Sequence, residues 1–512
     1  MPFDAQSESS ETELKFTLGA GALESLADHP VISSPSQRTR LRSVYFDTPE
    51  HDLREHGLSL RVRECEGRFV QTLKSRNGSV IARGEWECEV AGCAPEPAAL
   101  GDSPFRAEIL ALEERLAPVF VTVVDRAISV WSDGDSDIEI SLDTGEVIAH
   151  DGVYPIHELE LELSRGDAAA LFRLGRELSA KALLIPSFQS KAERGYRLAG
   201  HEGGAALRAE AASVGRKTTA EDAFRQVVRT CVRQISGNAE LFESAKHPRA
   251  LHQVRVGLRR LLAALKVFNG AVNPIQAGAM KVECVWLSRE LDLARNIDVF
   301  ADRHLANDAD AANVDPKLAA FYNRVLEAQG RASESAAQAF GSERFARFLL
   351  DLTAWVELPG IAGDQPEQVA CASGLAASLA RERLAQLTRR ARKAGLRFRD
   401  LDPAARHRLR LKIKTLRYAA EGLVGAFKTS PARVNRYLEA VKTLQERLGD
   451  LNDVEGARST AMKIVGARAS ELAFTAGVLV AGYSDQHAKL NRQAEKAVRQ
   501  FLRAKVFWGP HK

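Results

Sequence analysis

The hydrophobic pattern changes its period once along the chain, and this change constrains the fold more than any other feature. Up to about Gly200, apolar and polar residues alternate, which predicts β-strands separated by turns such as "RNG" at 76–78 and "DTG" at 143–145. From about Thr218 onward, apolar residues recur about every 3.6 residues, in long segments rich in Ala, Leu and Arg. We therefore expect an antiparallel α+β domain followed by an all-α domain.

The segment between these two parts, "GHEGGAALRAEAASVGRK", is rich in Gly and Ala and has no sustained pattern, as is typical of a linker. A chain of 512 residues is long enough for two or three domains, each with its own core. We predict an N-terminal domain over residues 1–200, a linker over 201–217 and a helical domain over 218–512.

The helical part repeats itself. "LHQVRVGLRRL" at 251–261 and "RHRLRLKIKTLRY" at 406–418 both carry a histidine followed by basic residues at the third and seventh positions after it. Similar helix ends follow each of them, "LSRELDLARNIDV" at 287–299 and "LQERLGDLNDV" at 444–454. The repetition predicts two related halves of roughly 150 residues that arose by duplication.

Composition excludes few functions but indicates a compartment. With 71 basic and 67 acidic residues, the net charge of +4 favours no class of partner. The six cysteines are scattered without metal-ligand or disulfide spacing, which is typical of a reducing compartment. The first residues, "MPFDAQSESS", do not have the pattern of a signal peptide, and the apolar window at 472–483 is shorter than the roughly 20 residues that span a bilayer. We expect a cytoplasmic protein without a membrane partner.

Several predicted strands carry charges on one face and apolar residues on the other. The charged faces hold Glu11, Glu13 and Lys15; Arg61 and Arg63; Arg83, Glu85, Glu87 and Glu89; Glu139 and Asp143; and Glu158, Glu160 and Glu162. Lys74 and Arg126 end two further strands, and Lys191 and Arg194 follow in "SKAERGY". These faces are either the solvated outside of an ordinary sheet or the lining of a barrel. Segregation of the charges by strand and the prominence of Arg favour a barrel that binds a polyanion with a hard divalent cation.

The N-terminal sequence resembles the CYTH family, the triphosphate tunnel metalloenzymes. "ETELK" matches the ExExK signature, and "YFDTPEHDLREHGLSLRVR", "TLK", "ARGEWECEV", "SLDTGEV", "ELELEL" and "SKAERGY" continue the similarity in order over residues 8–200. The resemblance implies an eight-stranded antiparallel β tunnel that hydrolyses a triphosphate with Mg²⁺ or Mn²⁺. It implies metal ligands at Glu11, Glu13, Glu160 and Glu162, and phosphate ligands at Lys15, Arg61, Arg63, Lys74, Arg83, Arg126, Lys191 and Arg194. Glu11 and Lys74 are the expected catalytic residues.

Two basic stripes lie on the repeated helices. His252, Arg255, Arg259 and Lys266 share one helix face, and His407, Arg410, Lys414 and Arg417 share another. Such stripes are either solvated surfaces or the walls of a groove for a polyanion. "HQVRVGLRRL" and the "RNIDV" and "LNDV" helix ends resemble the CHAD family over about residues 218–505. The resemblance implies an all-α domain of two pseudo-symmetric helical bundles that binds inorganic polyphosphate, with His252 and His407 in its basic cleft. Aromatic residues are sparse near both stripes, which disfavours nucleic acid.

The sequence therefore predicts a metal-dependent inorganic triphosphatase, a hydrolase of phosphoanhydride bonds, joined to a polyphosphate-binding helical domain. Four alternatives remain open. Three use the same tunnel: hydrolysis of thiamine triphosphate, hydrolysis of a nucleoside triphosphate, and the cyclisation of ATP by class IV adenylate cyclases. The fourth is a targeting module for polyphosphate with little catalysis.

Overall fold

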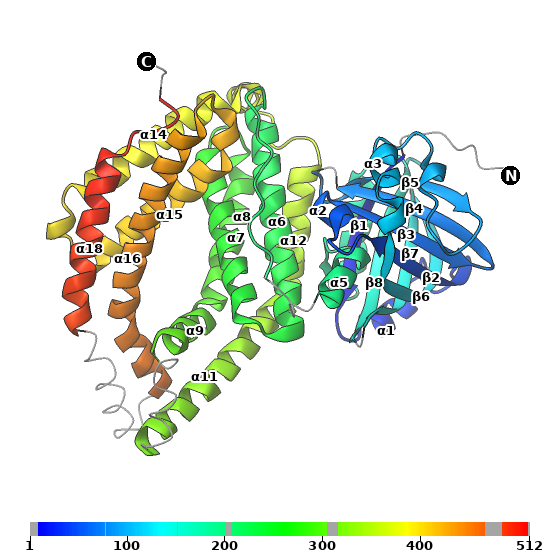
Figure 1. Ribbon diagram of the computed structural model, residues 1–512, viewed down its shortest axis with the longest axis horizontal. Coiled ribbons are helices and arrows are strands. Elements are labelled where there is room, and N and C mark those ends of the chain that lie inside the picture. The colour runs from blue at the N-terminus through cyan, green and yellow to red at the C-terminus, as the bar shows by residue number, and fades with distance from the viewer. Residues whose placement is uncertain are drawn as a thin grey trace. The chain divides into compact units, whose positions relative to one another are not determined.

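The computed structural model describes residues 9–76, 78–150, 152–200, 206–304, 316–465 and 484–509. The chain forms two compact units (Figure 1). The barrel unit comprises Met1–Leu207 together with Gly341–Pro359, and the helical unit comprises Arg208–Phe340 and Gly360–Lys512. One short segment of the helical part of the sequence thus belongs to the barrel unit.

Eight antiparallel strands close into a barrel, which confirms the tunnel expected from the sequence (Figure 1). In ring order these are β5 (Ala82–Val90), β4 (Arg68–Arg76), β3 (Leu58–Cys65), β2 (Gln37–Asp47), β6 (Ala117–Ser132), β7 (Asp137–Ala149), β8 (Gly152–Arg165) and β1 (Ser9–Leu18). The ring closes where Ser9–Thr12 of β1 pair with Ala82–Glu85 of β5. Beyond this closure, β9 (Leu184–Pro186) takes over the same edge of β1.

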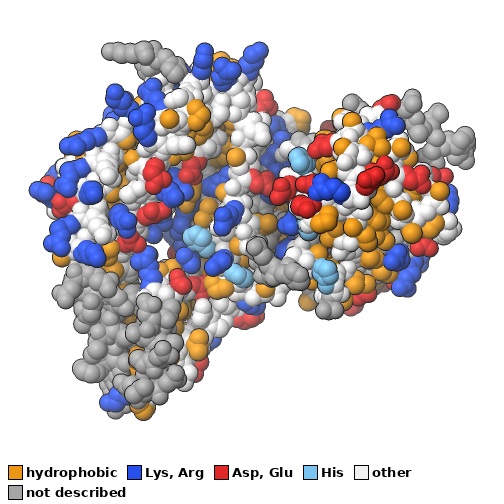
Figure 2. Space-filling view, viewed as in Figure 1, with side chains coloured by type: hydrophobic (Ala, Val, Ile, Leu, Met, Phe, Trp, Pro, Cys, Tyr) orange, Lys and Arg blue, Asp and Glu red, His pale blue; other side chains and the backbone are white. Residues whose placement is uncertain are grey.

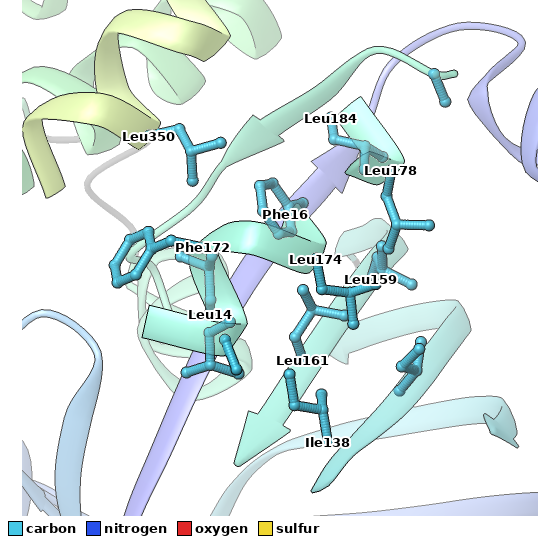
Figure 3. Close-up of a cluster of buried hydrophobic side chains, with 14 of the residues drawn as sticks. Leu14, Phe16, Ile138, Leu159, Leu161, Phe172, Leu174, Leu178, Leu184 and Leu350 are labelled. Atoms are coloured by element: carbon cyan, nitrogen blue, oxygen red, sulfur yellow. The ribbon is translucent and has the colours of Figure 1, made fainter. Parts of the chain in front are cut away.

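The apolar faces of the strands point outward and are covered by helices. Leu14 and Phe16 of β1 and Leu161 of β8 are fully buried against helix α4 (Ala169–Ser179) (Figure 3). Because successive side chains of a strand point to opposite faces, the charged residues between these positions point into the barrel. Burial of the outer face therefore decides between the two interpretations of the charged faces in favour of an inward-facing lining.

The remaining helices of the barrel unit are short, except for α5 and α12. They are α1 (Ala22–Ala27), α2 (Asp52–Glu55), α3 (Arg106–Leu110), α5 (Lys191–Ala199) and α12 (Glu343–Glu357). Helix α5 begins at a capping box, in which the Ser190 hydroxyl accepts a hydrogen bond from the Glu193 amide and the Glu193 carboxylate accepts one from the Ser190 amide. This cap fixes the start of α5 and hence the position of Lys191.

The helical unit contains α6 (Ala220–Ala245), α7 (Pro248–Val267), α8 (Pro274–Glu290), α9 (Asp292–His304), α11 (Pro316–Phe340), α13 (Pro366–Ser373), α14 (Ala376–Gly395), α15 (Pro403–Gly422), α16 (Pro431–Val465) and α18 (Ser484–Arg503). Several of them begin with proline after a polar cap, as where the Asp402 side chain accepts from the Ala405 amide before α15. Helices α7 and α15, which carry the repeated histidine motifs, pack against each other. The all-α character expected of this part is confirmed.

Within the described ranges, no helix is long and apolar enough to cross a bilayer. The apolar window at 472–483 lies outside the described residues.

The packing of β8 against α4 predicts a difference between two positions on that strand. Leu161→Ala should lower the free energy of unfolding of the barrel unit by about 2–5 kcal/mol, because it opens a cavity in a core where Leu161 is 0% exposed. Val153→Ala, on the same strand but 58% exposed, should change it by less than about 0.5 kcal/mol. Pulse proteolysis of the full chain in urea, with detection of barrel-unit peptides, measures both values. Equal losses would contradict the assignment of the outer face as a packed core.

Candidate active site

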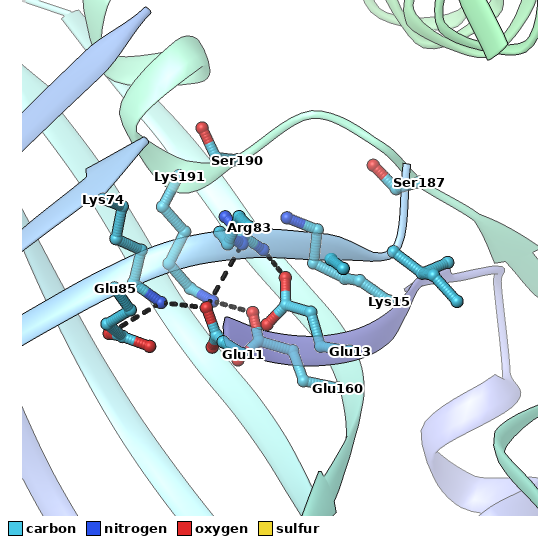
Figure 4. A network of polar contacts seen from close by, with 12 residues as sticks. Glu11, Glu13, Lys15, Lys74, Arg83, Glu85, Glu160, Ser187, Ser190 and Lys191 are labelled. Atoms are coloured by element: carbon cyan, nitrogen blue, oxygen red, sulfur yellow. Dashed lines mark hydrogen bonds and ion pairs between the residues drawn. The ribbon is translucent and has the colours of Figure 1, made fainter. Parts of the chain in front are cut away.

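Charged side chains from neighbouring strands pair with one another at the closure of the barrel (Figure 4). Lys74 Nζ lies 2.7 Å from Glu11 Oε2 and 3.0 Å from a carboxylate oxygen of Glu85. Arg83 Nε lies 3.2 Å from Glu11 Oε2, and the Arg83 guanidinium also pairs with Glu13. These contacts join β4 and β5 to β1, so the predicted site residues themselves help to close the ring.

A second group of carboxylates gathers around Lys191. Asp143 of β7 and Glu158 and Glu160 of β8 each offer an oxygen within 4.8 Å of the others. The Lys191 ammonium lies 2.8 Å from Asp143, 2.6 Å from Glu158 and 2.7 Å from Glu160. The first residue of α5 thus contacts all three carboxylates of a triad on the barrel wall.

Three more predicted phosphate ligands surround this triad. Arg126 donates to Asp143 Oδ2 at 2.6 Å and to Glu160 Oε2 at 2.7 Å, and Arg194 pairs with Glu158. Lys15 donates to the backbone carbonyl of Gln189. Burial opposes the ionisation of Glu158, but the Arg194 and Lys191 cations outweigh it and lower its pKa to about 2. Glu158 and Glu160, whose pKa is also lowered, are therefore ionised at neutral pH.

The two arginines of β3 have different surroundings. Burial opposes the charge of Arg61, but Tyr45, Glu85 and Glu87 outweigh burial and raise its pKa. Arg61 lies 3.8 Å from the carboxylate of Glu87 and 4.0 Å from that of Glu85. Arg63 Nε is buried and has no hydrogen-bond partner within the described part of the chain. Burial, followed by the nearby Arg61 and Arg126 cations, lowers the pKa of Arg63 to about 10. Arg63 thus faces other cations in a place where an anion would be stabilised.

Near the barrel closure, carboxylates outnumber the cations that pair with them. Glu162 lies directly across the β1–β8 ladder from Glu13. Burial and the neighbouring carboxylate of Glu11 raise the pKa of Glu162 to about 7, and Glu85 and Glu139 act in the same direction. Lys74 opposes this shift but does not cancel it. The carboxylates here repel one another and would be stabilised by an additional cation.

The donor set of the barrel fits a hard divalent cation, because Mg²⁺ and Mn²⁺ favour carboxylate oxygens. The triad of Asp143, Glu158 and Glu160 has suitable oxygen spacing, but three cations already pair with it, namely Lys191, Arg126 and Arg194. The carboxylates around Glu162 carry the uncompensated charge. The sequence-predicted ligands come from both groups.

The structure brings all the predicted N-terminal site residues to the barrel interior. They are Glu11, Glu13, Lys15, Arg61, Arg63, Lys74, Arg83, Arg126, Glu160, Glu162, Lys191 and Arg194. The expected catalytic residues, Glu11 and Lys74, form an ion pair with each other. Asp143, Glu158 and Glu85 also belong to the site but received no role from the sequence. The available signal was their alternation with residues already assigned to the same strand faces.

In the helical unit, five of the eight predicted basic residues form one cluster between α7 and α15. They are His252, Arg255, Arg259, Arg410 and Lys414. Burial, followed by the Arg259 and Arg410 cations, lowers the pKa of Lys414 to about 6, although Asp453 acts in the opposite direction. Burial and the surrounding cations also lower the pKa of His252 to about 4. We call these five residues the basic cluster.

The other three predicted residues have different neighbours. His407 Nδ1 lies 2.6 Å from Asn452 Oδ1, and Arg417 donates to Glu421 at 2.7 Å. The charged neighbours of Lys266 are Arg390, Lys412 and Lys281, because Lys266 lies two helical turns beyond Arg259. Arg295 of α9, which the sequence did not single out, is the cation with the largest electrostatic effect on His252.

Comparison with known proteins agrees with both units. Residues 9–196 match the CYTH domain family and residues 226–461 match the CHAD domain family. An inorganic triphosphatase from Haemophilus influenzae is 30% identical over 173 residues, which is 32% of this chain and 47% of that protein, so the match spans about half the length of this curated relative. The crystal structure of the CHAD domain from the plant Ricinus communis is 29% identical, covers 60% of this chain and 100% of its own, and superimposes with a TM-score of 0.51. The chain therefore belongs to the proteins in which a CYTH domain is followed by a CHAD domain.

Proposed function

We propose that the barrel unit is a metal-dependent inorganic triphosphatase that hydrolyses tripolyphosphate to pyrophosphate and phosphate, and that the helical unit binds inorganic polyphosphate. The observation that carries the first part is the convergence of basic and acidic side chains inside a closed barrel. The similarity to an inorganic triphosphatase supports it.

In this proposal the basic residues of the barrel hold the phosphates. Arg63 has the clearest role, because it faces Arg61 and Arg126 and gains an anionic partner when a phosphate enters. The planar guanidinium groups suit bidentate contacts with phosphate oxygens. Lys15, Lys74, Arg83, Lys191 and Arg194 would complete the set around a linear polyanion.

Glu11, Glu13, Glu160 and Glu162 would hold Mg²⁺ or Mn²⁺. The bound cation would neutralise charge on the phosphate oxygens in the transition state. Glu11, whose carboxylate Lys74 and Arg83 hold in place, would orient a water molecule toward the terminal phosphorus. The water oxygen would form a bond to that phosphorus while the bond to the bridging oxygen breaks. Pyrophosphate would leave with the electron pair of that bond, and the proton lost by the water would pass to the solvent.

We further propose a cytoplasmic location. All six cysteines are unpaired in the structure, which fits a reducing compartment.

Glu160→Gln tests the assignment of the site. It should lower the rate of phosphate release from tripolyphosphate by at least about 100-fold, because it removes a charge that faces Lys191 and Arg126 and that would hold the metal. Glu89→Gln on β5, whose side chain is 75% exposed, is the matched control and should leave the rate unchanged. Phosphate release is measured with Mg²⁺ or Mn²⁺ and again after chelation, which should abolish it in the wild type.

The same assay separates the alternative substrates. Tripolyphosphate, thiamine triphosphate and ATP are compared, with orthophosphate and pyrophosphate measured separately. Orthophosphate release that is fastest from tripolyphosphate supports the proposal, whereas pyrophosphate release from ATP would indicate cyclisation instead. A folded Glu160→Gln protein with full activity would refute the site assignment.

The basic cluster is the part of the helical unit that would bind polyphosphate. Its cations lie beside other cations. Burial and these neighbouring cations lower the pKa values of His252, Arg255, Arg410 and Lys414. A chain of phosphates supplies the missing negative charge without requiring aromatic platforms for bases. Arg295 extends the cluster onto α9.

Polyphosphate binding should tighten as the pH falls from about 8 to 6. Lys414 has a pKa of about 6 in the free protein, since burial and the Arg259 and Arg410 cations outweigh Asp453. Polyphosphate favours the charged form, so binding takes up a proton and the affinity should rise by up to about tenfold per pH unit over this range. Lys414→Arg keeps the charge at every pH and should flatten this dependence. Calorimetric titration with long-chain polyphosphate measures both proteins, and equal slopes would contradict the role of Lys414.

A further inference from the structure

Helix α12 is part of the barrel unit although it lies within the sequence that matches the CHAD family. The chain leaves the helical unit after Phe340 and returns to it at Gly360. Between these points Leu350 and Ala354 of α12 are buried in the same core as Leu14 and Phe172 (Figure 3). The outer cover of the barrel therefore depends on a segment far from the CYTH sequence.

The last residue of α12 binds the turn between β4 and β5. The Glu357 carboxylate accepts a hydrogen bond from the Ser79 hydroxyl at 3.0 Å and from the Val80 amide at 3.1 Å. The Ser79 hydroxyl oxygen in turn accepts from the amides of Ile81 and Ala82, both at 3.1 Å. One carboxylate thus organises four successive residues of the turn.

This turn leads directly into the closure of the barrel. The Ile81 carbonyl accepts a hydrogen bond from the Glu13 amide at 2.7 Å. Two residues later, Arg83 lies opposite Glu11 in the β1–β5 ladder and pairs with the carboxylates of Glu11 and Glu13. Arg83 also lies opposite Arg76 at the end of the β4–β5 ladder, so the turn and the two ladders together determine where Arg83 sits.

We propose that Glu357 is a positioning residue of the triphosphatase. It fixes the β4–β5 turn from outside the barrel and so holds Arg83 in register with Glu11 and Glu13 inside it. This inference rests on the proposed function of the barrel unit. It assigns to the CHAD-matching part of the sequence a direct structural contribution to the phosphate site.

A second anchor of α12 provides a matched control. Asp351 pairs with Arg176 of α4 at 2.9 Å, and both side chains are partly exposed. This pair attaches the same helix to the same unit but does not touch the turn. Because Leu350 and Ala354 remain buried in either variant, α12 should stay in place when one polar anchor is removed.

The test compares Glu357→Ala, Glu357→Gln and Asp351→Ala in the full chain, with kcat and KM for tripolyphosphate in the presence of Mg²⁺ or Mn²⁺. Glu357→Ala should lower kcat/KM by about tenfold, mainly through KM, because misplacing a phosphate-binding guanidinium weakens binding. Glu357→Gln, which keeps an acceptor oxygen and the side-chain shape, should recover part of the loss. Asp351→Ala should leave both constants unchanged.

Hydrogen exchange of the same proteins gives a readout independent of activity. The amides of Val80, Ile81, Ala82 and Glu13 should exchange faster in Glu357→Ala than in the wild type and in Asp351→Ala. If the wild type is active and both Glu357 variants retain its kcat and KM, the inference is wrong while the proposed function stands. Equal losses in Glu357→Ala and Asp351→Ala would also overturn it, because general loosening of α12 would then be the cause. A wild type without triphosphatase activity would overturn the proposed function and this inference together.

Discussion

Mutual neutralisation of charges inside the barrel is the constraint on which the rest of the structure depends. A buried charge is costly unless it is paired, and the strands place many charges on the enclosed face. The pairs Lys74–Glu11, at 2.7 Å, and Lys191–Glu160, at 2.7 Å, meet this requirement by joining different elements. The pairs that neutralise the barrel lining are therefore the groups that a triphosphate and a cation would separate. Stability and ligand binding compete for the same side chains.

An inward-facing polar lining also requires an outer cover, and this requirement explains helices α4 and α12 of the barrel unit. Here the charged face lines the interior of the barrel, so the apolar face points outward. That face needs a layer of helices to shield it from water. Helix α4 covers Leu14, Phe16 and Leu161, and α12 extends the same core with Leu350. The chain supplies α12 from beyond the CYTH sequence, so the barrel unit includes a segment that separate domain matches assign elsewhere.

Alternation in the sequence predicts the strands and their charged faces, but alternation alone does not say which face is enclosed. Segregation of charges by strand gave the correct answer. Asp143 and Glu158 were missed because their role depends on Lys191, which reaches them from α5 across the fold. On the helices, the stripe of basic residues is correct, yet Lys266 lies too far along α7 to join the basic cluster. Nothing in the sequence of Glu343–Glu357 distinguishes α12 from an ordinary amphipathic helix, because its partners are long-range.

The cations of the two units have opposite electrostatic surroundings. In the barrel, Lys191 is held by three carboxylates, and these raise its pKa against the effect of burial. In the proposed function, a triphosphate would compete with those carboxylates, and a divalent cation would take over the released negative charge, so substrate binding would be linked to metal binding. In the basic cluster, Lys414 lies among cations and has a lowered pKa of about 6, so an incoming phosphate would relieve repulsion there, although Arg255 already has a carboxylate partner in Asp292. The proposed ligands therefore differ: the barrel would take a polyanion together with a metal, whereas the basic cluster would take a polyanion together with a proton from the solvent.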